Sequence, residues 1–442
     1  MHWGSATRVP GTKAVAAGGY ARVNSISCAS AGECAAGGVY LDHHLHFQAF
    51  VVSEHGGVWG NAIEVPGLAA LNVRGDAEVN SISCGSPGNC SAGGYYLGGR
   101  AFVVPERGGV WGSAIEVPVA ADLNVTDDAT VYSVSCGSPR TCTALGAYDI
   151  GVVDPAYPPS GQTFVISEHD GVWGKRHDVP GKENSVSCGG AGSCVAVGSS
   201  QDGQGVDHAF LVVERNGKWG KGKRVAGMWA LSAGRTSEAQ SVSCASPGNC
   251  AVGGVYAGEA RGRTSAFVLD EKHGTWSKPT PVPGIANATV TSISCTSEGN
   301  CAAGGDYDAY GNYPRQPFVV AEEKGTWSKP VTVRGLRALN ADHVGLVTSV
   351  SCAGEGNCAA VGTYASGEDD DHNPWYFRAF VVTDHDGAWS RPQHLPGLGP
   401  AVEPSSVSCV RSGNCTIGGL SSSDGQPYPW STFQGQAFVT AP

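Results

Sequence analysis

Residues 241–250 decide the fold of this chain, and they read SVSCASPGNC. The same stretch occurs eight times with small changes, and each copy holds two cysteines at positions i and i+6. The first cysteines of successive copies lie 51 to 57 residues apart, so the chain is an array of repeats. All 16 cysteines are used in these pairs, which are Cys28 and Cys34, Cys84 and Cys90, Cys136 and Cys142, Cys188 and Cys194, Cys244 and Cys250, Cys295 and Cys301, Cys352 and Cys358, and Cys409 and Cys415.

The complete pairing of the cysteines predicts one disulfide within each repeat and an oxidising compartment. The alternative is a reduced protein with structural or metal-binding thiols. Zinc sites, however, favour closer C-x₂₋₄-C pairs and need four ligands. We therefore expect a secreted, extracellular protein. Residues 1–3 do not begin a signal peptide, so we expect the export signal to lie outside this sequence.

The composition argues against a nucleic-acid partner and against insertion in a membrane. The chain has 28 Lys and Arg against 39 Asp and Glu, which gives a formal net charge of −11. A nucleic-acid binder needs a basic face to neutralise phosphates, and none is visible, so we expect no nucleic-acid partner. No apolar run reaches the length of about 18 residues that a membrane span needs, so we expect no membrane insertion.

Each repeat contains four strand signals, which in the first repeat are residues 23–28, 34–40, 49–54 and 58–66. These short runs are bounded by Gly, Pro and Asn, and no segment has the 3.6-residue period of a helix, which indicates an all-β protein. Four strands in a unit of about 50 residues are typical of a propeller blade. The sequence therefore predicts an eight-bladed β-propeller with four antiparallel strands and one disulfide in every blade.

Several positions recur in register and are interpreted as scaffold. Serines one and three residues before each first cysteine are expected to pack where inner strands converge on the axis. The glycine four residues after each second cysteine is expected to allow close backbone approach. Aromatic rings bury about 150–250 Å² each, so one per strand is expected to form the core between blades. These rings are Phe50, Phe102, Phe164, Phe210, Phe267, Phe318, Phe380 and Phe438 in the third strand, and Trp59, Trp111, Trp173, Trp219, Trp276, Trp327 and Trp389 in the fourth.

The two ends of the chain share one blade. The eighth repeat stops at residues 437–440, where its fourth strand should begin, whereas residues 3–11 (WGSATRVPG) match residues 59–67 (WGNAIEVPG). We therefore predict that the N-terminal strand completes the last blade and closes the ring, which removes exposed sheet edges. A single domain is expected, with blades near 23–67, 79–118, 131–181, 184–227, 240–284, 291–334, 347–397, and 405–442 plus 1–11.

Two connections vary in length and sequence, one between strands two and three and one between strand four and the next blade. In an up-and-down blade both emerge on the same face, opposite the cysteine loops. Variable loops on a constant scaffold are the usual place of binding specificity.

The variable loops of blades six, seven, eight and one concentrate non-core aromatics with Asp, Asn and His, and ring closure makes these blades neighbours. Aromatic faces beside carboxylates and amides suit a saccharide, but Tyr and Trp also dominate protein–protein hot spots. A third interpretation is local packing of long loops. We expect a cell-surface glycan or a protein partner at the residues Asp308, Tyr310, Tyr313, Asp371, Asn373, Trp375, Tyr376, Asp424, Tyr428, Trp430, His43 and His46.

Metal and catalytic motifs are weak or missing. Residues 368–371 offer four carboxylates for calcium but lack the spacing of a calcium loop. His43, His44 and His46 could hold a transition metal, although three histidines in one loop are a weak signal. The sequence has no G-x-S-x-G, H-E-x-x-H or phosphate-binding glycine loop. We expect no catalytic residues, no metal site and no cofactor, and hence a binding module rather than an enzyme.

The pattern S-x-S-C-x-x-x-G-x-C-x-A-x-G-x-Y, followed by A-F-V-V and G-x-W, resembles secreted actinobacterial propeller repeats and, more loosely, extracellular HAF repeats. The low methionine count, two, beside 65 glycines fits a GC-rich bacterial genome. In size and in lacking an enzyme motif, the chain is similar to the propeller lectin subunits of streptomycete umbrella toxin particles. That resemblance implies a subunit of a larger secreted complex that docks on target-cell surfaces.

Overall fold

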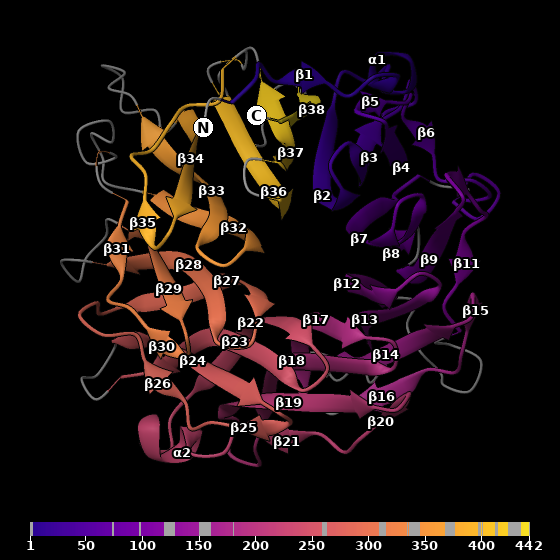
Figure 1. The fold of residues 1–442 in the computed structure, drawn as a ribbon. Helices are drawn as coiled ribbons and strands as arrows, with labels where there is room; N and C mark the ends of the chain where they lie inside the picture. Colours follow the sequence, from indigo (N-terminus) through magenta and orange to yellow (C-terminus); the bar gives the residue numbers. More distant parts are fainter. Residues whose placement is uncertain are drawn as a thin grey trace.

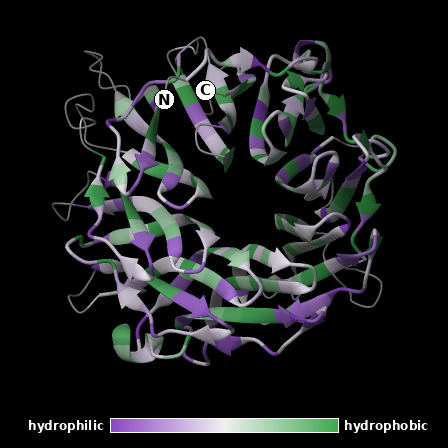
Figure 2. Cartoon of the chain, viewed as in Figure 1, coloured by the Kyte–Doolittle hydropathy of each residue, from purple (hydrophilic) through white to green (hydrophobic). Residues whose placement is uncertain are grey.

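The computed structural model describes residues 3–72, 75–96, 99–118, 129–149, 161–179, 181–258, 263–308, 315–333, 335, 345–366, 376–396, 399, 401–411, 414–422 and 435–441. These residues form eight antiparallel sheets arranged as a ring around a central axis (Figure 1). The eight-bladed β-propeller predicted from the repeats is confirmed. Figure 2 shows hydrophobic and hydrophilic residues alternating along the strands, as expected of sheets that pack through their faces.

The blades follow one another around the ring in chain order, and each starts with its innermost strand (Figure 1). The first four blades comprise β2 (Ala21–Ser30), β3 (Glu33–Leu41), β4 (Phe47–His55), β5 (Val58–Trp59) and β6 (Ile63–Glu64); β7 (Glu78–Ser86), β8 (Asn89–Tyr96), β9 (Arg100–Arg107), β10 (Val110–Trp111) and β11 (Ile115–Glu116); β12 (Ala129–Ser138), β13 (Thr141–Asp149), β14 (Gly161–His169), β15 (Val172–Trp173) and β16 (His177–Val179); and β17 (Lys182–Gly190), β18 (Ser193–Gln201), β19 (Asp207–Arg215), β20 (Lys218–Trp219) and β21 (Lys223–Arg224).

The remaining blades comprise β22 (Ser237–Ser246), β23 (Asn249–Ala257), β24 (Thr264–Lys272), β25 (Thr275–Trp276) and β26 (Thr280–Pro281); β27 (Ala288–Ser297), β28 (Asn300–Asp308), β29 (Arg315–Glu323), β30 (Thr326–Trp327) and β31 (Val331–Thr332); β32 (Gly345–Gly354), β33 (Asn357–Ser366), β34 (Tyr376–His385) and β35 (Ala388–Trp389); and β36 (Ala401–Arg411), β37 (Asn414–Ser422), β38 (Gln436–Thr440) and β1 (Thr7–Arg8). In the described residues, two single-turn helices lie in connections between blades, α1 (Thr12–Val15) and α2 (Met228–Leu231). At four residues each, they are far too short to cross a membrane.

The fourth strand is not continuous, which differs from the prediction of one strand over residues 58–66. In the first blade, β5 and β6 both pair with the outer edge of β4, and the chain between them leaves the sheet. The reason is a competing partner, because the backbone N–H of Ala62 donates to the carbonyl oxygen of Pro10 in the neighbouring blade (2.8 Å). The break therefore connects adjacent blades.

The N-terminal strand closes the ring as predicted. β1 pairs antiparallel with β38, with Thr7 opposite Val439 and Arg8 opposite Phe438. This is the register of β6 in the first blade, where Glu64 lies opposite Phe50. Both chain ends therefore lie in the eighth blade, at the top of Figure 1.

The disulfide prediction is confirmed in every blade. Each bond joins opposite residues of the first hairpin, as Cys28 and Cys34 do in β2 and β3 with Cα atoms 3.9 Å apart. The other seven bonds have the same connectivity, and the described residues contain no free cysteine. Disulfides of this density indicate an oxidising environment.

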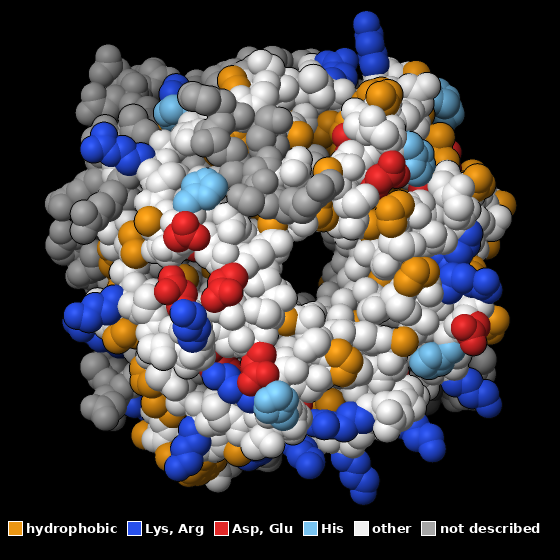
Figure 3. Space-filling model, in the orientation of Figure 1, with side chains coloured by type: hydrophobic (Ala, Val, Ile, Leu, Met, Phe, Trp, Pro, Cys, Tyr) orange, Lys and Arg blue, Asp and Glu red, His pale blue; other side chains and the backbone are white. Residues whose placement is uncertain are grey.

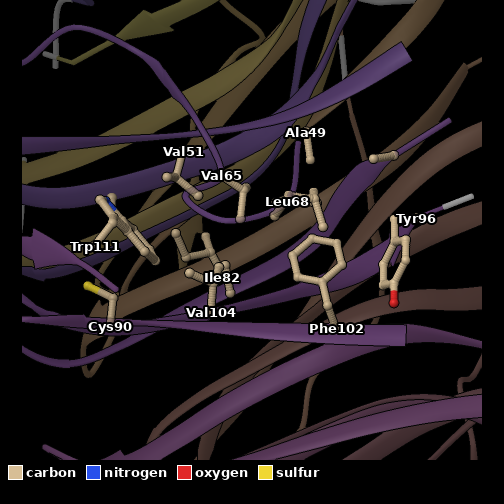
Figure 4. Packing of buried hydrophobic residues seen from close by; sticks show 14 residues of the cluster. Ala49, Val51, Val65, Leu68, Ile82, Cys90, Tyr96, Phe102, Val104 and Trp111 are labelled. Carbon is tan, nitrogen blue, oxygen red and sulfur yellow. The ribbon is translucent and has the colours of Figure 1, made fainter. Parts of the chain in front are cut away.

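The core lies between neighbouring blades. Figure 4 shows one interface, where Val51 of the first blade lies near Ile82 of the second and Leu68 lies near the ring of Phe102. All eight third-strand phenylalanines are at most 3% exposed, which confirms them as core. Most of the tryptophans are only half-buried, because they follow the turn onto the outermost strand and cover one end of each cluster. Trp3 and Trp111 are the fully buried ones, at 7% and 9% exposed.

The recurring serines do more than fill space near the axis. The hydroxyl of Ser27 accepts a hydrogen bond from the backbone N–H of Cys84 in the next blade (3.0 Å), and Ser25 accepts one from Ile82 (3.1 Å). The same two bonds recur at all eight blade junctions, including the closing one between blades eight and one. They satisfy N–H groups on the free edge of the innermost strand.

The recurring glycine after the second cysteine marks a close backbone approach, as expected. A Cβ atom at Gly38 would lie 1.9 Å from the carbonyl oxygen of Arg22 on the paired strand. No side chain fits there without moving the backbone.

Candidate binding surface

The ring has one uniform face and one variable face. On the uniform face, the cysteine loop and the turn after the third strand are joined by a hydrogen bond from the N–H of Gly57 to the oxygen of Gly32, and blades two to seven repeat this contact. On the opposite face the two variable connections of a blade contact each other. In the first blade Ala77 N–H donates to the oxygen of Phe47, and Asn72 Nδ2 donates to Gln48 Oε1 (2.7 Å).

Most of the predicted ligand residues fall outside the described part of the chain. These are Tyr310, Tyr313, Asp371, Asn373, Trp375, Asp424, Tyr428 and Trp430. Asp308 ends β28, and its backbone N–H donates to the oxygen of Asn287 (3.1 Å). Tyr376 begins β34. The described strands that flank these loops end on the variable face. The binding sector itself stays a prediction.

The histidine loop of the first blade is built around one carboxylate. Asp42 accepts the backbone N–H groups of His44 (2.8 Å) and His46 (2.9 Å) and the side-chain amide of Gln48 (3.2 Å). Burial would raise the pKa of Asp42, but these hydrogen bonds outweigh it and lower that pKa. The ring centroids of His43 and His44 lie 3.7 Å apart, with the two planes tilted by 44°. Among the residues that the structure describes, no three His, Cys, Asp or Glu side chains converge on a possible metal position.

A groove of about 260 Å³ opens where the ring closes, between β1, α1 and β38. It is lined by Arg8, Thr12, Lys13, Ala16, Gly19, Ala21, Gly435 and Gln436. The groove belongs to the junction of blades eight and one, inside the sector that the sequence singled out. Neither of its two cationic residues was a candidate in the sequence analysis, because a lone arginine and a lone lysine near the N-terminus carry no motif.

An exposed tryptophan in α2 was also missed. Trp229 is 61% exposed, and its ring lies 5.4 Å from that of His208. His208 is buried and its Nε2 lies 2.8 Å from a carboxylate oxygen of Asp202, whose pKa is lowered to about 2 by that contact and by two backbone N–H groups. The available signal was position, since Trp229 lies outside the G-x-W register of the repeats.

A ring of buried carboxylates lies at the uniform face, each opposite the tryptophan of its blade, and sequence reasoning did not detect its burial. The members are Glu54, Glu106, Glu168, Glu214, Glu271, Glu322 and Asp384. Three of them face a cation from the preceding blade: Arg107 donates to Glu168, Arg215 donates to Glu271 (2.9 Å), and Lys272 lies 3.9 Å from Glu322. These carboxylates are therefore part of the junctions between blades.

The junction of blades six and seven breaks this pattern, because Glu323 occupies the place of the cation. Burial first, and then the charges of Glu323 and Asp386, raise the pKa of Asp384 to about 6. Burial and the charge of Asp270 raise the pKa of Glu322 to about 7. Both acids line a cavity of about 10 Å³, which has room for roughly one water molecule and cannot admit a sugar. Figure 3 shows acidic side chains gathered left of the channel, over β22–β35.

Comparison with known proteins supports the fold and nothing finer. No family model matches the sequence, and no curated protein matches it. Among solved structures, the chain is similar to Sqt1 from Chaetomium thermophilum, with 12% identity, a TM-score of 0.51 and 96% of each chain covered. A structure of Sqt1 bound to the N-terminus of ribosomal protein L10 shares 14% identity, with a TM-score of 0.49 and 95% of each chain covered.

A puromycin-hydrolyzing peptidase of Mycobacterium tuberculosis has 11% identity and a TM-score of 0.47, over 96% of this chain and 61% of that chain. At such identities the likeness shows the fold alone, and one fold carries many functions. The protein is thus a disulfide-stapled eight-bladed β-propeller, an architecture widely used for binding and scaffolding.

Proposed function

We propose that the protein is a secreted, non-enzymatic binding module whose variable face recognises cell-surface glycans. The observation that carries this proposal is that one face of the ring is nearly the same in every blade, whereas the other differs from blade to blade. One disulfide repeats in every blade and the serine bonds repeat at every junction, whereas the variable connections of the first blade contact each other on the other face. A constant frame with individual loops is the usual construction of a recognition surface.

Saccharides are favoured by the residue types on that face. A sugar offers C–H surface to an aromatic ring and hydroxyls to fixed acceptors. The expected loop aromatics Trp375 and Trp430 supply rings, and the exposed ring of Trp229 shows that the variable face also carries a tryptophan outside the core.

A binding role is also favoured over catalysis by the distribution of acids. Seven buried carboxylates are spread one per blade along the uniform face, rather than paired in a cleft that could hold a substrate. The two that share a cavity, Glu322 and Asp384, have room for about one water molecule beside them. General acid–base chemistry needs such groups within reach of a substrate.

The proposal is tested with a glycan array on the purified protein and two loop variants. Trp375→Ala and Trp430→Ala should each weaken binding by 2 kcal/mol or more, roughly thirtyfold, because stacking aromatics dominate such sites. Trp111→Ala is the matched control in the core, and it should lower the melting temperature instead. If both loop variants bind glycans like the parent protein, the glycan site does not lie in this sector.

A protein-interaction scaffold is the second candidate, and one observation favours it. Figure 3 shows an open channel along the axis, and Tyr132 on the innermost strand β12 is 49% exposed. A partner polypeptide could dock in that channel, as a subunit of a larger secreted toxin complex would require. Capture of one defined partner from culture medium, lost in Tyr132→Ala and kept in Trp375→Ala, would favour the scaffold over the glycan module.

A further inference from the structure

We propose that the groove between β1, α1 and β38 binds the oxyanion of an acidic saccharide, a carboxylate or a phosphate. The inference rests on the proposed function, and it adds the chemical class of the ligand and the residues that would recognise it. Arg8 and Lys13 are the recognising side chains, and the groove between them has a volume of about 260 Å³. That volume suits a monosaccharide-sized group, since drug-sized ligands occupy about 300–1,000 Å³.

The groove is a local cationic site on an acidic protein. No Asp or Glu is among its described lining residues, and both of its charged residues are positive. The chain as a whole has a net charge of −11, so an anion is repelled at long range and needs a concentrated positive site to bind. Figure 3 shows Lys and Arg side chains at the top edge of the molecule, where Figure 1 places β1 and α1.

The charge at the position of Arg8 is reversed relative to the equivalent position in the first three blades. Arg8 lies opposite the core residue Phe438, as Glu64 lies opposite Phe50 in the first blade. The acid at that position accepts a hydrogen bond from a tyrosine hydroxyl in each of the first three blades, as the pairs Tyr40–Glu64 (3.4 Å), Tyr96–Glu116 (2.8 Å) and Tyr148–Asp178 (3.1 Å).

In the eighth blade both partners of this pair are replaced. Ser421 stands two residues after Gly419, in the place that Tyr40 has after Gly38, and the acid is replaced by Arg8. The arginine thereby reverses the charge at this position of the outer strand. The eighth blade therefore has a cation that lines the groove at the strand position where the first three blades have an acid bonded to a tyrosine.

The arginine is held in position for an anion. Gln436 Oε1 accepts a hydrogen bond from Arg8 Nε (3.0 Å), and both residues line the groove. A guanidinium presents its donors as a planar fork that matches carboxylate and phosphate oxygens. An arginine fixed by a side-chain partner loses less rotamer entropy when a ligand binds.

The rest of the groove is rigid as well. Its floor is backbone, where Gly435 N–H donates to the oxygen of Gly19 (3.0 Å) and Ala21 N–H donates to the oxygen of Gly435 (2.9 Å). The helical turn that carries Lys13 is anchored by Thr12, which is buried and donates its hydroxyl to the oxygen of Val9 (2.6 Å). The site therefore has a preformed shape around its two cations.

Blade four supplies a matched control. It repeats both replacements, with Ser200 and Arg224 in the places of Ser421 and Arg8, but Trp229 takes the place of Lys13. A change at Lys223 and Arg224 therefore removes the same charge from an equivalent strand on the opposite side of the ring. It leaves the two cations of the closing groove untouched.

The test measures calorimetric affinity for three probes: sodium glucuronate, glucose 6-phosphate and glucose. The parent should bind at least one acidic probe more tightly than glucose, and added NaCl should weaken that binding through screening. The double variant Arg8→Gln/Lys13→Gln should lose at least tenfold in affinity for that probe, since charge-assisted hydrogen bonds are lost. Lys223→Gln/Arg224→Gln should stay within about twofold of the parent.

Folding of both variants is checked by melting temperature, which should be unchanged because β1 pairs through its backbone. The charge-conserving variant Arg8→Lys/Lys13→Arg should keep the preference for the acidic probe. An equal loss in the blade-four variant, or no loss in the groove variant, overturns the inference. The experiment also distinguishes failure of this inference from failure of the proposed function. If Trp375→Ala and Trp430→Ala abolish glucose and acid binding while the groove variant binds like the parent, the glycan module stands and the groove is not its acid site.

Discussion

Glu323 lies at the position where three other junctions between blades have a cation that faces a buried acid. Its effect on charge is confined to the junction of blades six and seven. In blades two, four and five the residue after the buried acid is Arg107, Arg215 or Lys272, and each reaches the acid of the next blade. At the junction of blades six and seven the same position brings a second negative charge toward Asp384. One residue thus makes this junction different in charge while its backbone follows the common pattern.

This junction predicts a pH dependence of stability. The pKa of Glu322 is raised to about 7 and that of Asp384 to about 6, so the folded state holds protons that the unfolded state releases above ordinary carboxyl pKa values. Stability from these groups is therefore complete below the ordinary carboxyl pKa values near 4 and is lost as pH rises to the folded-state values of about 6 and 7, by at most about 3 kcal/mol for each group. Calorimetry from pH 5 to pH 8 should show a falling melting temperature.

Glu323→Lys tests the cause. The ammonium group would restore the inter-blade cation beside Asp384, so the melting temperature at pH 8 should rise and the part of its pH dependence that Asp384 causes should flatten. The part from Glu322, which burial and Asp270 cause, should stay. Glu355→Lys makes the same charge change at an exposed site in the cysteine loop of blade seven, and it should leave the slope unaltered. Equal effects of both variants would mean that overall charge, and not this junction, controls the pH dependence.

Individual elements were predicted well where their partners are close in the sequence. The first hairpin of each blade follows from its apolar run, its turn and its cysteine spacing, all within a few residues. The fourth strand was predicted less well, because the N–H of Ala62 bonds to Pro10 in a different blade. Burial of acids such as Glu106 was missed for the same reason, since only the stacked neighbour covers them.

The serine ladder makes a prediction at the level of the inner strand. Ser27→Ala removes the acceptor for the N–H of Cys84 at the junction of blades one and two. Ser27 is only half-buried, so the loss should be about 1 kcal/mol in urea unfolding, near the ordinary value for one hydrogen bond. Ser30→Ala, at the end of the same strand, is the control. A Ser27 variant as stable as the Ser30 variant would show that these serines act by size alone.

The closed ring could be predicted because the N-terminal sequence matches the fourth strand that the last repeat lacks. Residues 3–11 repeat the pattern of 59–67, and β1 takes the register that β6 has in the first blade. The binding sector could be predicted only as far as a face and a set of blades. Loop residues such as Trp375 carry no periodic pattern, and the groove at Arg8 depends on side chains that come together only when the ends meet.

Closure itself gives the last prediction. Deleting residues 1–11 removes β1 and two buried side chains, Trp3 and Val9, and leaves the edge of β38 without its partner. Burial of two such apolar side chains is worth about 3–6 kcal/mol, and an unpaired strand edge is a template for association. The melting temperature should therefore fall by several degrees, and light scattering should detect oligomers. A deletion of residues 1–2 is the control. A peptide of residues 1–11 added in trans should restore part of the loss by pairing with β38, whereas a monomeric deletion variant as stable as the control would contradict closure through this strand.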